Sequence, residues 1–232
     1  MARANRHYSP GLVWHLTHRC HKREFLLKFA RDKRAWFHWM LEAKKNFGLC
    51  ILNYIITSNH IHLLVLDKEG NDGQVISRSL HLAAGRVAQE YNNRKNRSGA
   101  FWEDRYHATA IETGEHFIRC ITYIDLNMVR ANVVRHPSEW PFGGYFELQQ
   151  PRERLRNQLI EGREVLRLLG MRDLNQLRRV RTEWLGMAHR WGFLERDAQW
   201  TESVAIGGRR FREKVLERLG RTAELNEDGR SP

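Results

Sequence analysis

Hydrophobic residues along the first 150 positions alternate between two periods, that of strands and that of helices. Short apolar runs rich in β-branched residues predict strands, and apolar positions spaced three and four residues apart predict helices. The segments with strand character are residues 12–17, 49–57, 60–66 and 105–111. The segments with helix character are residues 32–47, 73–93 and 114–131.

The order of these segments is β-α-β-β-α-β, followed by one more helix. This order predicts an α+β fold of the ferredoxin-like, split βαβ type, in which one antiparallel sheet carries helices on a face. Pro141 and the pair Gly143-Gly144 mark the end of the unit. We therefore expect one domain over residues 1–150 and a helical, basic C-terminal extension over residues 151–232.

The charge of the chain points to a polyanionic partner. The sequence has 39 Lys and Arg against 27 Asp and Glu, which gives a net charge of +12. Lys and Arg bind phosphates and release their counterions, so a surplus of this size favours a nucleic acid. A basic protein without such a partner is the alternative that charge alone leaves open.

Neither the apolar runs nor the cysteines indicate a membrane or an oxidising compartment. No apolar run reaches the roughly 18 residues of a membrane-spanning helix, and the N-terminus lacks the apolar stretch of a signal peptide. Cys20, Cys50 and Cys120 are far apart and form no CxxC pair, so we expect reduced, buried thiols. These features predict a cytoplasmic, nucleoid-associated protein that does not contact membranes.

A histidine pair stands out in the third predicted strand. Residues two apart on a strand share a face, so His60 and His62 stand side by side while Ile61, Leu63 and Val65 point to the opposite, core face. Two imidazoles in this arrangement can bind one divalent cation. An incidental pair is the alternative that this motif leaves open.

The predicted helix over residues 114–131 has two stripes. Its apolar stripe is Phe117, Ile121, Ile124 and Met128. Its polar stripe is Arg119, Tyr123, Asn127 and Arg130. If the polar stripe borders the histidine face, an oxygen nucleophile, a metal site and phosphate-binding groups meet; otherwise it is a solvated surface.

These segments together resemble the REP-associated tyrosine transposases, a branch of the single-tyrosine, IS200-like HUH transposases. His60-Ile61-His62 resembles their HUH motif, and Tyr123-Ile124-Asp125-Leu126-Asn127, with Val129-Arg130-Ala131 behind it, resembles their catalytic helix. Two further stretches, Tyr8-Ser9-Pro10-Gly11 and Phe101-Trp102-Glu103-Asp104-Arg105-Tyr106, also match. The resemblance covers about residues 1–146.

The resemblance implies a metal-dependent endonuclease and strand transferase for single-stranded DNA. Tyr123 would attack the scissile phosphate and form a 5′-phosphotyrosine link. His60, His62 and the amide oxygen of Asn127 would bind Mg²⁺ or Mn²⁺. The implied substrate is a hairpin-forming repetitive extragenic palindrome (REP).

Two other functions stay open at this point, the transposase of a mobile insertion element and a non-catalytic hairpin-binding protein. A monomer and a homodimer are equally compatible with the sequence. The candidate DNA contacts are Arg3, Arg6, Arg105, His107, Arg119 and Arg130. Asp125, two residues from Tyr123, is expected to be an exposed surface charge.

Overall fold

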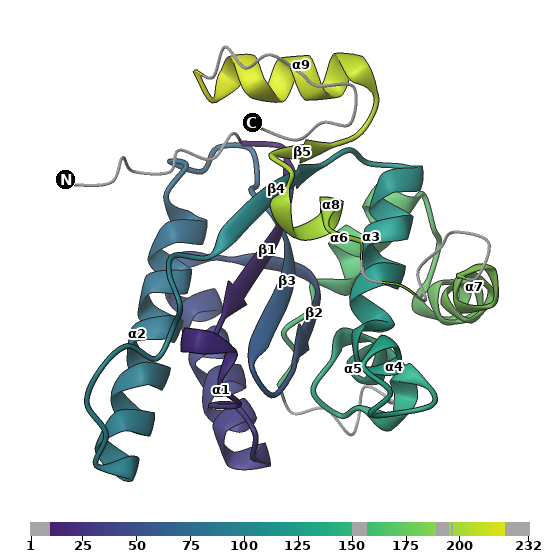
Figure 1. Ribbon diagram of the computed structural model, residues 1–232. Coiled ribbons are helices and arrows are strands. Elements are labelled where there is room, and N and C mark those ends of the chain that lie inside the picture. Colours follow the sequence, from purple (N-terminus) through teal and green to yellow (C-terminus); the bar gives the residue numbers. More distant parts are fainter. Residues whose placement is uncertain (1–9, 150–156, 189–194, 196, 221–232) are drawn as a thin grey trace.

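The computed structural model describes residues 10–149, 157–188, 195 and 197–220 (Figure 1). Its sheet has five strands in the order β2-β3-β1-β4-β5. The strands are β1 (Val13–Arg19), β2 (Cys50–Ile56), β3 (His60–Leu66), β4 (His107–Ile111) and β5 (Ala205–Ile206). The first four strands pair antiparallel, which confirms the predicted ferredoxin-like arrangement. Strand β5 pairs parallel to β4 and is an addition that the sequence pattern did not predict.

Helices cover both faces of this sheet, with α1 and α2 on one side and α3 with much of the C-terminal part on the other (Figure 1). The longer helices are α1 (Ala30–Phe47), α2 (Val75–Lys95), α3 (Glu115–Asp125), α6 (Gly162–Leu169), α7 (Leu174–Met187) and α9 (Arg209–Arg218). The shorter ones are η1 (His21–Arg23), α4 (Asn127–Arg130), η2 (Pro137–Glu139), α5 (Gly144–Gln149) and α8 (Gln199–Glu202).

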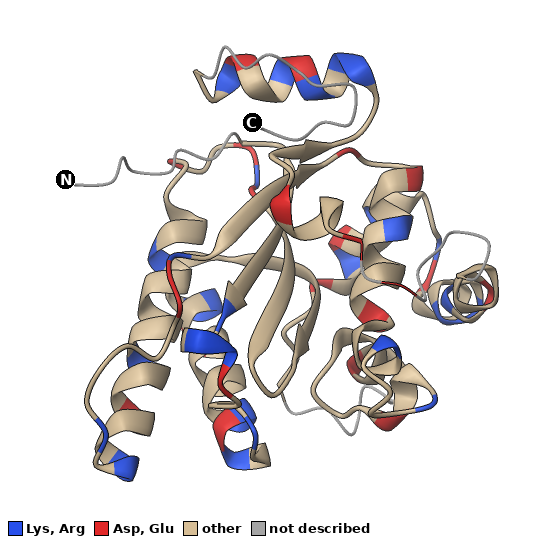
Figure 2. Ribbon diagram, in the orientation of Figure 1, with Lys and Arg blue, Asp and Glu red and all other residues tan. Residues whose placement is uncertain are grey.

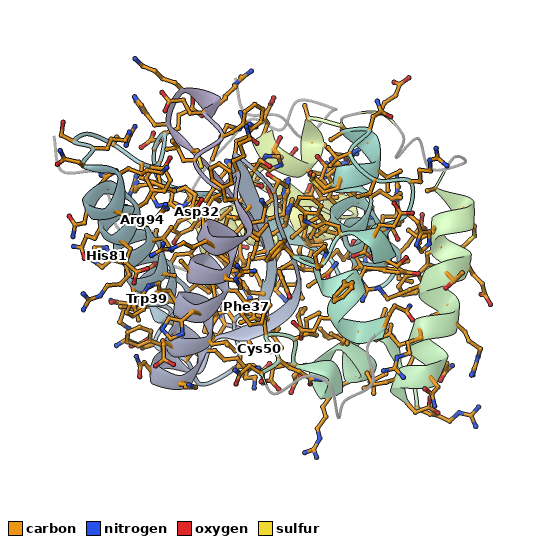
Figure 3. All side chains as sticks on the ribbon, turned by 90° about the horizontal axis from the view of Figure 1, so that it is seen from below. Asp32, Phe37, Trp39, Cys50, His81 and Arg94 are labelled. Carbon is orange, nitrogen blue, oxygen red and sulfur yellow. The ribbon has the colours of Figure 1, made fainter. Side chains whose placement is uncertain are left out.

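Helices α1 and α2 pack as their apolar spacing predicts. In α1 the stripe residues Trp36, Met40 and Ala43 are buried, and the helix ends at Gly48 in the left-handed conformation that glycine adopts without strain. Asp32 in the first turn of α1 forms an ion pair with Arg94 in the last turn of α2 (Figure 3). The two helices are therefore joined by a polar contact as well as by their apolar faces.

The predicted helix over residues 114–131 is interrupted once. Helix α3 ends at Asp125, Leu126 leaves the helical conformation, and α4 begins at Asn127. The backbone nitrogen of Arg130 still donates to the carbonyl of Leu126 at 2.9 Å, so the chain keeps its direction across the interruption. All four residues of the predicted apolar stripe are buried.

The structure overturns the prediction that Asp125 is a surface charge. Asp125 is 4% exposed, and its carboxylate accepts hydrogen bonds from Arg181 of α7 at 2.6 and 2.7 Å. Asn53 of β2 donates to the same carboxylate at 2.9 Å. Helix periodicity placed Asp125 away from Tyr123, but α7 comes from a remote part of the chain and covers that side of α3.

Other sequence expectations agree with the structure. Cys20, Cys50 and Cys120 are free thiols and are buried. Burial raises the pKa of the Cys20 and Cys50 thiols to about 12, so they stay protonated. Within the described residues, no helix is long and apolar enough to cross a bilayer.

Candidate active site

His60 and His62 share the face of β3 that is turned toward α3, as strand alternation predicts. Their ring centroids are 5.0 Å apart and their planes are nearly perpendicular, at 88°. The opposite face of β3 was expected to be the core face, but the histidine face is buried as well, because His62 is 2% exposed. The α3 layer buries this face too, so the histidines lie at the edge of a second apolar layer.

The ring of His60 is held in one tautomer by its neighbours. Its Nδ1 atom lies 2.8 Å from Oδ1 of Asn59, which can only accept, so Nδ1 carries the proton and donates it. The side-chain nitrogen of Asn59 is itself directed to the carbonyl of Arg23 at 3.1 Å. The Nε2 atom of His60 therefore keeps its lone pair, and it faces the amide of Asn127 at 3.3 Å.

His62 is supported from behind by two residues of β1 that the sequence analysis did not single out. Its Nδ1 atom lies 2.8 Å from Nε2 of His15 and 3.1 Å from Oγ1 of Thr17. Both residues stand at alternate positions of β1, where Thr17 is the direct register partner of His62. The sequence signal was available, since a polar pair two residues apart occurs inside the predicted strand over residues 12–17.

The buried imidazoles are held neutral. Burial lowers the pKa of His15 to about 3. Burial, with smaller contributions from His15 and His60, lowers the pKa of His62 well below its usual value. A neutral imidazole has a lone pair available, which is the form that binds a metal ion.

Tyr123 of α3 faces these histidines. The centroid of its ring lies 5.9 Å from that of His62, with the two planes at 89°. The ring also stacks on Trp200 of α8, 5.4 Å between centroids, and the side chain of Tyr123 is 3% exposed. The phenol therefore lies beside the histidine pair, which is the first of the two arrangements that the polar stripe left open, and part of its cover comes from the C-terminal extension.

Arg130 adds a positive charge at the phenol. Its guanidinium carbon lies 4.1 Å from the centre of the Tyr123 ring, and its Nη1 atom donates to the Tyr123 carbonyl at 2.9 Å. Burial lowers the pKa of Arg130 from its usual value, although the group remains a cation at neutral pH. A fixed cation at this distance favours negative charge on the phenol oxygen or on a phosphate placed beside it.

The two histidines of β3, the nucleophile candidate Tyr123 and the side chains of Asn127 and Arg130 line one pocket of about 260 Å³. Its lining consists of Arg19, Arg23, Asn59, His60, His62, Tyr123, Asn127, Arg130, Ala131 and Thr201. The local sequence pattern does not predict Arg19, Arg23 and Thr201 as site residues, because nothing in it shows that their segments meet at the histidines.

The other predicted DNA contacts lie elsewhere. Arg105 and His107 line a neighbouring pocket of about 180 Å³, which shares Arg19 and Thr201 with the first one. Arg119 is absent from both linings, and its guanidinium lies 3.9 Å from the carboxylate of Glu115 one turn earlier. Arg3 and Arg6 fall outside the described residues.

The donor atoms in the first pocket suit a divalent cation. In the described part of the chain, His, Cys, Asp and Glu form no cluster of three that could hold a metal. A third ligand beside His60 and His62 must then be of another type, and the amide of Asn127 is already placed at Nε2 of His60. A half-turn of that amide exchanges its nitrogen for its oxygen, so the same position can offer an oxygen ligand.

Comparison with family models yields a match to the family described as "Transposase IS200 like", over residues 9–127, just over half of the chain. No curated protein sequence matches the chain. Both the family match and the observed fold agree with the resemblance found in the sequence.

The solved structures similar to this chain include two transposases. One is a REP-associated tyrosine transposase bound to a REP hairpin, with a TM-score of 0.51 and 20% identity, covering 68% of this chain and 90% of that one. The other is a putative transposase from Deinococcus radiodurans R1, with a TM-score of 0.36 and 15% identity, covering 56% of this chain and 97% of that one. At these identities, the first likeness supports the fold.

Proposed function

Because the chain belongs to the IS200-like transposase family, we propose that it cleaves and rejoins single-stranded DNA through a covalent bond to Tyr123. The observation that carries this proposal is the meeting of Tyr123, the histidine pair and Asn127 in one pocket. The pocket also contains Arg19, Arg23 and Arg130, which suits a phosphodiester as substrate.

The reaction is a transesterification. The phenol of Tyr123 gives up its proton as its oxygen attacks the scissile phosphorus and bonds to the 5′-phosphate. The bond from phosphorus to the 3′ oxygen breaks, and that oxygen takes up a proton to leave a 3′-hydroxyl. The phosphodiester energy is conserved in the tyrosine link. A 3′-hydroxyl can therefore reverse the step and join strands without a nucleotide cofactor.

The residues around Tyr123 lower the barrier to this attack. A free phenol has a pKa of about 10 and is a weak nucleophile at neutral pH. The guanidinium of Arg130, 4.1 Å from the ring, favours its ionised form. Trp200 stacks on the ring and restricts its rotation, so the phenol is oriented before the DNA arrives.

His60, His62 and Asn127 would hold a divalent cation, Mg²⁺ or Mn²⁺. When bound, such a cation polarises the non-bridging phosphate oxygens. The chain prepares these ligands by fixing the His60 tautomer through Asn59 and by supporting His62 through His15 and Thr17. Support of this kind orients a ligand ring toward the ion.

For the substrate we propose a hairpin of the REP type with an adjoining single strand. The support is the sequence resemblance described above and the similar structure that is bound to a REP hairpin. We further propose residues 1–150 as the catalytic domain and residues 151–232 as its extension. Thr201 lines the pocket and Trp200 contacts the nucleophile, so the extension takes part in the site.

The test is a denaturation-resistant adduct. The protein is incubated with Mn²⁺ or Mg²⁺ and a labelled hairpin oligonucleotide that carries a single-stranded flank. We expect a covalent protein–DNA band that requires the cation and disappears in Tyr123→Phe. Tyr91→Phe, which alters a tyrosine of α2 outside the pocket, is the matched control and should form the band normally.

The remaining outcomes separate the alternatives. Tight hairpin binding without an adduct would support a non-catalytic binding protein. An adduct that survives in Tyr123→Phe would overturn the assigned nucleophile. A preference for the ends of an insertion element over REP hairpins would support a mobile transposase.

A further inference from the structure

The segment between β1 and α1, residues 20–29, runs beside the catalytic pocket in an unusual backbone conformation. Lys22 and Arg23 are consecutive non-glycine residues with positive φ, 50° and 58°. Such strain persists only where surrounding contacts impose it, and it is concentrated at functional sites. Here the strained turn carries Arg23, which lines the pocket.

The turn before His60 imposes this conformation. The side chain of Asn59 donates to the Arg23 carbonyl at 3.1 Å, and the backbone nitrogen of Leu27 donates to the Ser58 carbonyl at 2.9 Å. Asn59 also fixes the His60 tautomer. The segment is therefore held in register with the site by the residue that orients a proposed metal ligand.

This segment exposes two aromatic rings. Phe25 is 65% exposed and Phe29 is 56% exposed, whereas Leu26 and Leu27 between them are buried. Scattered exposed apolar side chains are ordinary. Phe25 and Phe29 differ from such scattered side chains in two respects. They lie on one segment that leads into a phosphate-binding pocket, and the same segment buries its other apolar residues.

Cations lie beside the Phe29 ring and along the segment. The Nζ atoms of Lys28 and Lys95 lie 5.9 and 5.8 Å from the centre of the Phe29 ring. Arg97, in the loop after α2, lies 3.8 Å from the carboxylate of Glu24 in the segment. Figure 2 shows Lys and Arg at the C-terminal end of α2 and along the segment between β1 and α1.

Resting on the proposed function, we propose that Phe25 and Phe29 form a stacking platform for unpaired bases of the DNA strand that enters the pocket. Proteins bind single strands by combining cations that follow the backbone with aromatic faces on which bases stack. The platform, defined as Phe25 and Phe29, supplies the faces. Lys28, Lys95 and Arg97 supply the cations, and Arg23 leads to the scissile phosphate.

Binding is measured by fluorescence anisotropy in EDTA, so that no cleavage intervenes. The variants are Phe25→Ala, Phe29→Ala and their double. The control is Val133→Ala, which removes another large exposed apolar side chain, 56% exposed, from the turn after α4 instead of from the segment. Since both rings are exposed, the circular dichroism and melting temperature of the variants should match those of the unaltered protein.

The expected effect is selective for unpaired bases. Each ring lost should weaken binding of a flanked hairpin about 5- to 150-fold, the range set by base–aromatic stacking. The same DNA with abasic sites in the unpaired positions should bind the double variant and the unaltered protein equally. A hairpin without a flank and a linear single strand show whether the stacked bases belong to the hairpin loop or to the flank.

Three outcomes would overturn the platform: binding by the double variant equal to that of the unaltered protein, an equal loss with abasic DNA, or an equal loss with blunt duplex. These results are distinct from failure of the proposed reaction. If the unaltered protein forms no adduct while the phenylalanine variants lose base-dependent binding, the platform stands and the cleavage proposal fails. If the adduct forms and the variants bind normally, only the platform fails.

Discussion

Two buried polar clusters lie on different sides of the same helix, and they are completed in different ways. Asp125 and Tyr123 are two residues apart on α3, and they are 4% and 3% exposed. Asp125 has all its partners within the chain, from Arg181 and Asn53. The groups around Tyr123 instead converge on a pocket with nitrogen and cationic groups along its walls.

The difference separates polar groups that maintain the fold from those that await a ligand. Burial raises the pKa of Asp125, while Arg181 and Asn53 act in the opposite sense and stabilise the carboxylate. At the pocket, His60 turns its Nε2 lone pair toward another side chain that can equally offer an oxygen. Closed networks of the first kind are costly to break, whereas the second kind should respond to ligand, metal and pH.

The largest expected effect on stability follows from breaking the closed cluster, which consists of Asp125, Arg181 and Asn53. Arg181→Ala leaves the Asp125 carboxylate buried without its cation and should lower the free energy of unfolding by about 3–5 kcal/mol. Chemical denaturation measures this. Arg179→Ala, on the exposed side of α7, should change stability by less than about 0.5 kcal/mol.

A double variant sharpens this prediction. Asp125→Leu with Arg181→Met replaces the ion pair by apolar side chains and should recover much of the lost stability. If Arg181→Ala costs no more than Arg179→Ala does, the ion pair is not what holds α7 against α3.

Metal binding tests the open cluster, which consists of His60, His62, Tyr123 and Asn127. At a free Mn²⁺ concentration a hundredfold above its dissociation constant, the free energy of unfolding should rise by about 2.7 kcal/mol, and EDTA should reverse the gain. His60→Ala should abolish it. His81→Ala, at an exposed position of α2, should retain it. Equal stabilisation of all three proteins would place the ion elsewhere.

A smaller effect comes from the close approach between α5 and β2. A Cβ atom at Gly144 would collide with Oδ1 of Asn53 and would lie 2.7 Å from Cδ1 of Ile160. Gly144→Ala should therefore cost about 1–3 kcal/mol and disturb the amide that supports Asp125.

The control for this variant is Gly85→Ala. Gly85 lies inside α2 with no atom within 4 Å of its added Cβ, so alanine should stabilise by up to about 1 kcal/mol. A loss of stability in Gly144→Ala together with a gain in Gly85→Ala confirms the contact, and a gain in both variants would contradict it.

Acid should destabilise the metal-free protein gradually. The folded-state pKa of His15 is about 3, and that of His62 is also lowered, against about 6.5 in the unfolded chain. Below pH 6.5 the unfolded state binds more protons. The stability is therefore complete above this pH and is lost below it, by about 1.4 kcal/mol per pH unit for each histidine.

Denaturation in EDTA at about pH 7.5, 6.5 and 5.5 measures this slope. His15→Asn should reduce the slope, and His81→Asn should leave it unchanged. A flat profile in the unaltered protein would show that the two imidazoles accept protons in the folded state.

Much of the fold and the core of the site could be predicted from local patterns. The alternation that places His60 and His62 on one face and the spacing that aligns Tyr123, Asn127 and Arg130 are properties of a single strand and a single helix. Arg119 belongs to the same stripe, yet it is absent from the linings of both pockets described here. Membership of a stripe fixes the direction in which a side chain points around the helix. It does not show which turns of the helix a neighbouring segment covers.

What the sequence by itself determined is the order and period of its elements, and with them the arrangement of the four antiparallel strands and the family. Only the tertiary structure decided that Asp125 is buried, that Trp200 and Thr201 reach the site, and that His15 supports His62. Each of these depends on segments far apart in the chain, from β1 to α8, meeting at one place. Local periodicity carries no information about which distant segment covers a face, because that choice is made by packing over the whole sheet.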